Sequence, residues 1–353
     1  MTRSDARLAL IEDWLSRELR LAPQRIEPAS SDASFRRYFR VFGARGTWIV
    51  MDAPPEKEDV RLYLKVAQLL ESLGVHVPHV HEADSARGLL LLEDLGTTLY
   101  LDRLSAGDDP QPLYGDALAA LAAIQVRGAA ASHELPPYDS AALGRELALM
   151  PEWFLARHLG LEATPAEGEL IAQVFDFLIR EALAQPAVFV HRDYHARNLM
   201  VVPGRNPGVI DFQDALRGPV GYDLVSLLKD CYIAWPRARV VDWVSGYRAR
   251  LGAEGGAGSL AGASEAEFLR WFDLIGVQRH IKVLGIFCRL WYRDGKRGYL
   301  ADLPRVLAYV RETCALYAEL SSLGRLLTER VAPELPRANA RVCAAPPEAV
   351  ADA

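Results

Sequence analysis

Several signals that would place this 353-residue sequence in a common class are absent. It contains no G-x-x-x-x-G-K-[ST], which excludes a P-loop enzyme, and no G-x-G-x-x-G. Because no C-x-x-C pair or Cys/His cluster occurs, we expect neither a zinc site nor a disulfide framework. The four scattered cysteines are Cys231, Cys288, Cys314 and Cys343.

Long hydrophobic runs are also absent. No uninterrupted apolar stretch approaches the length of a transmembrane helix, and the N-terminus lacks the apolar core and cleavage site of a signal peptide. The formal net charge of -6 is too mild for a general nucleic-acid binder and provides no polybasic membrane anchor. We therefore expect a cytoplasmic, soluble protein with no nucleic-acid, membrane or obligate protein partner.

The most informative stretch runs from Val190 to Val201. It has the H-R-D-x-x-x-x-N spacing of a kinase catalytic loop, in which Asp193 and Asn198 are the key acid and amide, and Asp211 follows as a metal-binding acid would. Phosphoryl transfer needs one carboxylate to deprotonate the attacking hydroxyl and two oxygen ligands to hold Mg²⁺ against the nucleotide phosphates. We predict Asp193 as the base and Asn198 and Asp211 as the metal ligands.

The residues between Asn198 and Asp211 predict a β-hairpin. Apolar, strand-like runs at 199–202 and 209–210 flank the segment 203–208, which is rich in Pro, Gly and Asn. A hairpin that closes there places Asn198 and Asp211 side by side, as two ligands of one ion require. An ordinary hydrophobic hairpin with polar ends would explain any one residue, but the whole combination favours a kinase-type site.

The N-terminal part of the chain predicts an ATP-binding lobe. Ser31 and Ser34 lie in a small-residue lead into a strand hairpin at 38–51, where backbone N–H groups would approach the nucleotide phosphates. A plain hairpin with a serine-rich lead explains this segment nearly as well. A helix is predicted over 58–73 because its apolar residues recur at helical spacing.

A short apolar run at 88–96 reads as a buried strand that leaves through an acidic turn. In a bilobal kinase this position joins the lobes and binds the adenine edge. We therefore predict Glu93 and Leu95 as nucleotide-binding residues, although any core strand followed by a turn would look similar.

From residue 113 onward the sequence predicts mainly helices, including a long one over 265–291. This helix and its continuation carry a basic span from Arg279 to Arg297, in which Asp294 is the only acid. Most such runs are solvated basic faces; the alternative is a site for an anionic group of the substrate, with aromatic residues against a sugar ring. The candidate substrate-binding residues are Asp214, Arg217, Arg289, Trp291 and Arg293.

The segment after Asp211 is short. Gln213 stands where a protein kinase has Gly, no A-P-E follows, and the next helix begins near Asp223, which is well placed to cap it. This leaves no room for a long regulatory activation loop. We therefore expect a small-molecule hydroxyl, rather than a protein, as the phosphoryl acceptor.

These segments resemble the aminoglycoside phosphotransferase family, whose members share the protein-kinase-like fold, over about residues 29–299. The strongest similarity is F-V-H-R-D-Y-H-A-R-N-L-M at 189–200, V-I-D-F-Q-D-A at 209–215 and G-P-V-G-Y-D-L at 218–224. Within the family, the chain is most similar to bacterial kinases that phosphorylate the anomeric hydroxyl of N-acetylmuramate and N-acetylglucosamine in cell-wall recycling. The segments that suggest this subgroup are 31–40, 51–56 and 289–296.

The resemblance implies an α+β, bilobal protein-kinase-like fold. Its β-rich N-terminal ATP-binding lobe would span 1–94, and its larger, mainly helical catalytic lobe would span 95–337. The Ala- and Pro-rich tail at 338–353 is expected to be disordered. The resemblance also implies ATP as co-substrate, Mg²⁺ as cofactor and an amino sugar as acceptor. Its anomeric hydroxyl is more acidic than an ordinary alcohol, so a modest carboxylate base suffices.

One position departs from the family pattern. Kinases of this fold carry a Lys on the third strand that holds the α- and β-phosphates, and the expected position here is Met51. Arg36 and Arg37 are the nearest replacements. If neither binds the phosphates, nucleotide binding is weak and the chain would be a pseudokinase. The intact base and metal ligands argue against that alternative.

Kinases of aminoglycosides, choline or homoserine are further alternatives. A polycationic aminoglycoside would need an acidic region where this chain is basic, and choline would need an aromatic cage without nearby cations.

Overall fold

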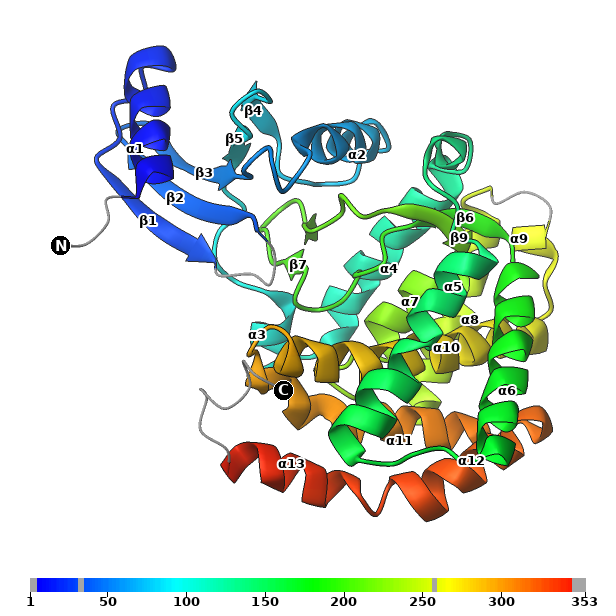
Figure 1. The fold of residues 1–353 in the computed structure, drawn as a ribbon. Helices are drawn as coiled ribbons and strands as arrows, with labels where there is room; N and C mark the ends of the chain where they lie inside the picture. Colours follow the sequence, from blue (N-terminus) through cyan, green and yellow to red (C-terminus); the bar gives the residue numbers. More distant parts are fainter. Residues whose placement is uncertain (1–4, 31–34, 256–258, 345–353) are drawn as a thin grey trace. The chain divides into compact units, whose positions relative to one another are not determined.

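The computed structural model describes residues 5–30, 35–255 and 259–344, and Figure 1 shows its fold. The chain divides into two compact units. Within the described residues, the first unit contains the chain up to Ile124 together with Arg197–Ala215, and the second contains Gln125–Ala196 and the chain from Leu216 onward. The lobe boundary after residue 94 stays a prediction.

The first unit is built on a five-stranded antiparallel sheet with the strand order β1-β2-β3-β5-β4. The predicted hairpin over 38–51 is confirmed, because β2 and β3 pair from Arg37 with Asp52 to Gly43 with Gly46. The strands are β1 (Arg25–Ser30), β2 (Arg37–Gly43), β3 (Gly46–Asp52), β4 (Val80–Asp84) and β5 (Leu89–Glu93).

Side chains alternate between the two faces of this sheet, and both faces are apolar. One face packs against α1 (Ala6–Asp13) and η1 (Trp14–Glu18). The buried members of this cluster are Ile11, Trp14, Leu15, Phe39, Val41, Val50, Leu89 and Leu91. Met51 lies on the opposite face, where it is 1% exposed. Position 51 is therefore part of the core.

The helices of the first unit follow the predicted pattern. α2 (Val60–Ser72) is capped by Asp59, whose side chain accepts from the N–H of Arg61 at 3.0 Å, and it lies within the range predicted from the sequence. The remaining elements are α3 (Tyr100–Ser105), α4 (Pro110–Arg127), which crosses into the second unit, β7 (Leu199–Met200) and β8 (Gly208–Val209).

The second unit is mainly helical and is arranged around α10 (Glu265–Tyr292), which confirms the long helix predicted over 265–291. Ser264 caps α10, because its side chain accepts from the N–H of Glu267 at 3.2 Å. The helices that contact α10 are α5 (Ser140–Leu147), α6 (Pro165–Leu183), α7 (Gly221–Leu228), α8 (Arg237–Ala253), α11 (Leu303–Cys314), η3 (Met150–Leu159) and η4 (Arg297–Asp302).

A two-stranded pair and several short helices complete the second unit. β6 (Ala187–Val190) pairs with β9 (Leu216–Pro219), and the loop that carries Asp193 follows β6 directly. The other elements are η2 (Ala131–Glu134), α9 (Ser259–Gly262), η5 (Ala318–Leu320), α12 (Ser321–Leu326), η6 (Leu327–Val331) and α13 (Leu335–Ala344). The predicted α+β class is confirmed, and no helix among the described residues is long and apolar enough to cross a membrane.

The C-terminal segment differs from the prediction. Residues 338–344, expected to belong to a disordered tail, continue α13. Leu335, Ala338 and Val342 recur at helical spacing and are buried in the hydrophobic cluster that α10 also joins. Their burial outweighs the low-complexity composition, and residues 345–353 lie outside the described part of the chain.

Candidate functional site

The β7–β8 hairpin brings the two predicted metal ligands together within the first unit. The two short strands pair along their length, and the Ile210 N–H donates to the carbonyl of Asn198 at 3.1 Å. As a result, Nδ2 of Asn198 lies 3.3 Å from Oδ2 of Asp211. Asp211 has a φ of 63°, in a region that residues with a side chain seldom adopt. Such outliers cluster at functional sites, and this one directs the carboxylate towards Asn198.

Other side chains of the first unit also hold the Asp211 carboxylate. Its Oδ1 accepts from Nε2 of Gln213 at 2.9 Å and lies 3.4 Å from Nη2 of Arg36. Gln213, at the position of Gly in a protein kinase, therefore fixes the acid directly. Phe212 is fully buried, and its ring centroid lies 4.8 Å from that of Tyr63 on α2. The residue that follows Asp211 thus packs against α2.

Asp193, the predicted base, lies in the second unit in the loop that follows β6 and is half-buried. Burial raises the pKa of Asp193, but nearby side chains outweigh that effect and hold its pKa below the ordinary value. The side chains that lower it are, in decreasing order, His195, Lys282, Arg279 and Arg192. The carboxylate is therefore ionised at neutral pH, which a proton acceptor requires.

A buried acid on α7 holds the backbone of this loop. Asp223 accepts from the His191 N–H at 2.6 Å and from the Arg192 N–H at 2.9 Å. The prediction that Asp223 caps the following helix is wrong, because α7 begins at Gly221 after Val220, and Asp223 points from its first turn to the loop. Burial raises the pKa of Asp223 to about 7, even though the two N–H groups lower it.

Glu146 of α5 connects the loop to α10. Its Oε1 accepts from Nη2 of Arg192 at 2.7 Å and from Nζ of Lys282 at 2.8 Å. Its Oε2 accepts from the Tyr138 hydroxyl and lies 3.4 Å from Nε2 of Gln278. This carboxylate therefore binds Arg192 and Lys282, two of the cations that lower the pKa of Asp193. Lys282 belongs to the predicted basic span, so part of that span is buried in the second unit.

Glu93 and Leu95, the residues predicted to bind the adenine edge, already have partners within the first unit. Oε1 of Glu93 lies 3.3 Å from Nε2 of His76, and Oε2 accepts from the His79 N–H at 3.2 Å. A contact between Glu93 and a nucleotide would therefore come from its backbone. Leu95 is 8% exposed, and a Cβ on Gly208 would lie 2.7 Å from its Cδ1, so Leu95 packs against the metal-ligand hairpin.

The four predicted phosphate-binding residues have different outcomes. Ser31 and Ser34 lie outside the described residues. Arg36 reaches Asp211, with only 11% of its side chain exposed. Arg37 is bound to Asp52, through Nε at 3.0 Å, and is not directed at the hairpin. Of the two replacements considered for the missing Lys, the geometry favours Arg36.

Of the predicted substrate-binding residues, Asp214 lies in the first unit and the other four lie in the second, where Arg289 and Arg293 interact electrostatically. Trp291 is 3% exposed within the hydrophobic cluster of the second unit, so its ring packs in the core. Arg293 is exposed and pairs with Asp294 at 2.8 Å. The other three candidates are Asp214, which is exposed, and Arg217 and Arg289, which are half-buried.

Glu146 was missed from the sequence, whereas Asp223 was singled out as a helix cap and not as a support for the loop. Asp223 carried a usable signal, because an acid that stands between apolar residues near the start of a helix is a candidate for burial with a hydrogen-bonding partner. Glu146 carried no comparable signal, since its partner Arg192 lies 46 positions away in the chain.

Along most of its length the chain is similar to known proteins. The model of the phosphotransferase enzyme family matches residues 25–263. The N-acetylmuramate/N-acetylglucosamine kinase of Pseudomonas aeruginosa is 48% identical over 336 residues, which cover 92% of this chain and 96% of its own. The kinase of the same name from Pseudomonas putida is 46% identical over 339 residues, which cover 93% of this chain and 98% of its own.

Solved structures agree with this fold at much lower identity. An ADP-bound aminoglycoside phosphotransferase has a TM-score of 0.56 at 14% identity, covering 88% of this chain and 99% of its own. A choline kinase from Streptococcus pneumoniae has a TM-score of 0.58 at 13% identity, covering 88% and 100%. The predicted protein-kinase-like fold is therefore confirmed. Since the family match spans most of the chain and two relatives are almost half identical over nearly their whole length, the chain belongs to the phosphotransferase enzyme family.

Proposed function

We propose that this chain transfers the γ-phosphoryl group of ATP to the anomeric hydroxyl of N-acetylmuramate and N-acetylglucosamine. The observation that carries the proposal is the 46–48% identity to kinases of that name, over 96–98% of their own length. The products would be the sugar 1-phosphate and ADP. We place the reaction in the cytoplasm, where ATP is available, as a step of peptidoglycan recycling.

The metal-ligand hairpin fits a magnesium ion. Mg²⁺ takes oxygen ligands and is usually held by one or two protein side chains, with nucleotide phosphates and water completing the shell. Asn198 and Asp211 lie side by side and offer amide and carboxylate oxygens. In the described part of the chain, no group of three or more His, Cys, Asp or Glu residues forms an all-protein metal centre. When bound, the ion would neutralise charge that develops on the β- and γ-phosphates.

Asp193 would accept the proton of the anomeric hydroxyl. Its pKa is held below the ordinary value by surrounding cations, so it is ionised but only weakly basic. A weak base is sufficient, because the anomeric hydroxyl is more acidic than an ordinary alcohol. Asp223 and Glu146 hold the loop that presents it. An intact base with intact metal ligands also argues against the pseudokinase alternative.

Nucleotide and acceptor contacts complete the proposal. We assign the adenine edge to the backbone at Glu93 and Leu95, and the nucleotide phosphates to Ser31, Ser34 and Arg36. For the acceptor we retain the polar candidates and omit the buried Trp291. The retained residues are Asp214, Arg217, Arg289 and Arg293.

The test is a substrate panel with MgATP. We expect release of ADP with N-acetylmuramate and N-acetylglucosamine and none above background with kanamycin or choline, and phosphorus NMR should show the phosphate on the anomeric carbon. Asp193→Asn should abolish transfer and leave ATP binding largely intact. Turnover on kanamycin alone would overturn the substrate, and an undiminished rate of Asp193→Asn would remove Asp193 as the base.

A further inference from the structure

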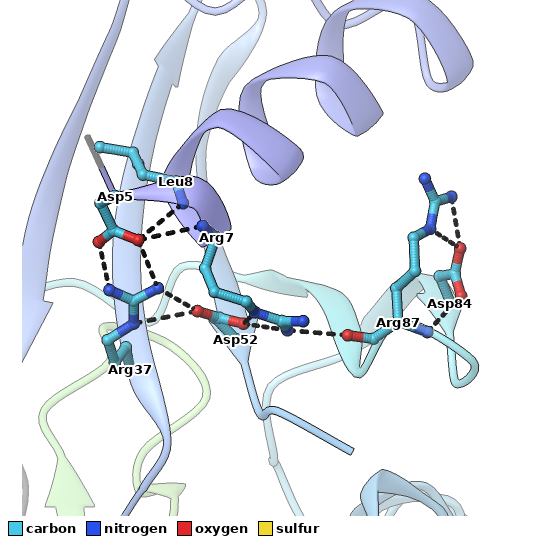
Figure 2. A network of polar contacts seen from close by, with 7 residues as sticks. All are labelled: Asp5, Arg7, Leu8, Arg37, Asp52, Asp84 and Arg87. Carbon is cyan, nitrogen blue, oxygen red and sulfur yellow. Dashed lines mark hydrogen bonds and ion pairs between the residues drawn. The ribbon is translucent and has the colours of Figure 1, made fainter. Parts of the chain in front are cut away.

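A buried carboxylate stands next to the position of the missing Lys. Asp52 follows Met51 at the end of β3 and is completely buried. Two arginines bind it from either side (Figure 2): Nε of Arg7 donates to Oδ1 at 2.9 Å, and Nε and Nη2 of Arg37 donate to Oδ2 at 3.0 and 2.5 Å. A buried acid is stable only when its charge is compensated, and the two guanidinium groups provide that compensation.

The same arginines tie the start of the chain to the sheet. Asp5 caps α1 by accepting from the N–H groups of Arg7 and Leu8 at 3.1 and 3.2 Å, and its carboxylate also binds the Arg37 guanidinium. Nη2 of Arg7 continues to the carbonyl of Arg87 at 2.8 Å. We call Asp5, Arg7, Arg37 and Asp52 the Asp52 clamp. It links α1, β2 and β3 through charged contacts.

The clamp lies on one face of the sheet, and Arg36 is directed to the other. Arg37 pairs with Asp52 across the ladder and stacks over the ring of Phe39, which packs against α1. Because side chains alternate along a strand, Tyr38 and its partner Met51 lie on the opposite face. Arg36, one residue before β2, turns to that second side.

The surroundings of Arg36 are those of a cation at a phosphate and metal site. Its Nη2 lies 3.4 Å from Oδ1 of Asp211, the predicted metal ligand. It also interacts electrostatically with Glu58 and Asp214, and its side chain is 11% exposed. A guanidinium offers several donors in a fixed plane that matches phosphate oxygens. Arg36 is therefore suited to hold a nucleotide phosphate beside the ion that Asp211 binds.

We propose that Arg36 replaces the missing strand Lys as the phosphate-binding cation, and that the Asp52 clamp is the positioning device that holds it there. This inference rests on the proposed kinase function but is independent of the acceptor. Asp52 and Arg37 act only through Arg36, because their own side chains are bound to each other on the face that packs against α1.

The test measures binding of MgADP and of adenosine by isothermal titration calorimetry. The single variants are Arg36→Gln, Arg37→Gln and Asp52→Asn, and the last two are repeated in the Arg36→Gln background. Arg45→Gln is the matched control, since Arg45 is an exposed arginine at the turn of the same hairpin. Arg37→Gln supplements Asp52→Asn, because the Arg37 side chain is 38% exposed and its replacement leaves Arg7 on the buried acid.

We expect Arg36→Gln to weaken MgADP binding roughly 10- to 100-fold, as loss of a charged hydrogen bond does, and to leave adenosine binding unchanged. Asp52→Asn and Arg37→Gln should weaken MgADP binding in the wild-type background but cause no further loss in Arg36→Gln. Arg45→Gln should bind as the wild type does.

Three results would overturn the inference. Wild-type affinity of Arg36→Gln would remove Arg36 from the phosphates. A further loss from Arg37→Gln in the Arg36→Gln background would show that Arg37 contacts them itself. Equal losses from Asp52→Asn in both backgrounds would mean that the clamp does not act through Arg36. ADP binding needs no acceptor, so these three results can be interpreted even if the proposed acceptor sugar is wrong. A wild-type chain that binds no ADP would overturn the kinase proposal as well.

Discussion

Replacing Glu146 with Gln should destabilise the loop that carries Asp193. Gln keeps the size of the side chain but removes the charge that compensates two cations, Lys282 at 2.8 Å and Arg192 at 2.7 Å. The side chains of Glu146 and Lys282 are only 13% and 10% exposed, so solvent cannot replace the lost contact. Removing one partner of a buried ion pair costs about 3–5 kcal/mol.

That cost is large against a total stability of roughly 5–15 kcal/mol for a folded protein. With about 2–4 °C of Tm per kcal/mol, as in chains of 150–250 residues, the melting temperature should fall by at least about 6 °C. Urea unfolding gives the free energy, and hydrogen exchange should show the loss in residues 190–197. Glu152→Gln is the control, because Glu152 is an exposed acid on η3, five residues after the end of α5.

The effect of Glu146→Gln should also depend on pH. Burial raises the pKa of Glu146, but Lys282 and Arg192 outweigh it, so its pKa in the folded chain is lowered. The carboxylate therefore stabilises the fold above its unfolded pKa of about 4.3, and that contribution is lost as the pH falls through the lowered value. The difference between wild type and variant should shrink in acid. A variant no less stable than Glu152→Gln at neutral pH would refute the reasoning.

Three further predictions concern other parts of the second unit. Burial raises the pKa of Asp223 to about 7, so the free energy of unfolding should decline as the pH rises from about 4 to 7. Over the upper part of that range kcat should rise, because the ionised acid accepts from the N–H groups of both His191 and Arg192. Asp223→Asn should abolish both trends. Gly285→Ala should cost about 1–3 kcal/mol in thermal unfolding, because its Cβ would lie 2.4 Å from the backbone of Leu149, whereas the exposed helical Gly246→Ala should stabilise slightly. Arg293→Ala should raise KM for N-acetylmuramate more than for N-acetylglucosamine, and equal effects would show that Arg293 does not read the carboxylate.

The parts of the fold that the sequence predicts are those set by local patterns. α2 and α10 have apolar residues at helical spacing and a side-chain cap at the first turn, and the β2–β3 hairpin closes at glycines. α13 was missed because its composition resembles a disordered tail, although Leu335, Ala338 and Val342 keep the helical period. That helix is stable because of the cluster it joins, which a local pattern does not reveal.

The candidate site divides in the same way. The adjacency of Asn198 and Asp211 follows from a hairpin of a few residues, so spacing and turn composition are enough to predict it. Glu146 meets Arg192 across 46 positions, and Asp223 meets His191 across 32. Contacts at that separation depend on how α5 and α7 pack, and the chemistry of the single residues does not specify it.

The exchange of a strand Lys for Arg36 explains why the first unit needs a clamp. A Lys at position 51 would be held without further support, because β3 pairs there with Tyr38 of β2 on one side and with Leu90 of β5 on the other. Arg36 precedes the first residue of β2 and has no such ladder. Its direction must be set by its neighbour, and Arg37 is fixed by two carboxylates, one of them completely buried. Position 51 then has no role in binding the nucleotide phosphates, and an apolar side chain occupies it. On this argument, restoring a Lys at Met51 should not rescue Arg36→Gln, because position 51 is 1% exposed and burying a new ammonium group there would cost more than it contributes.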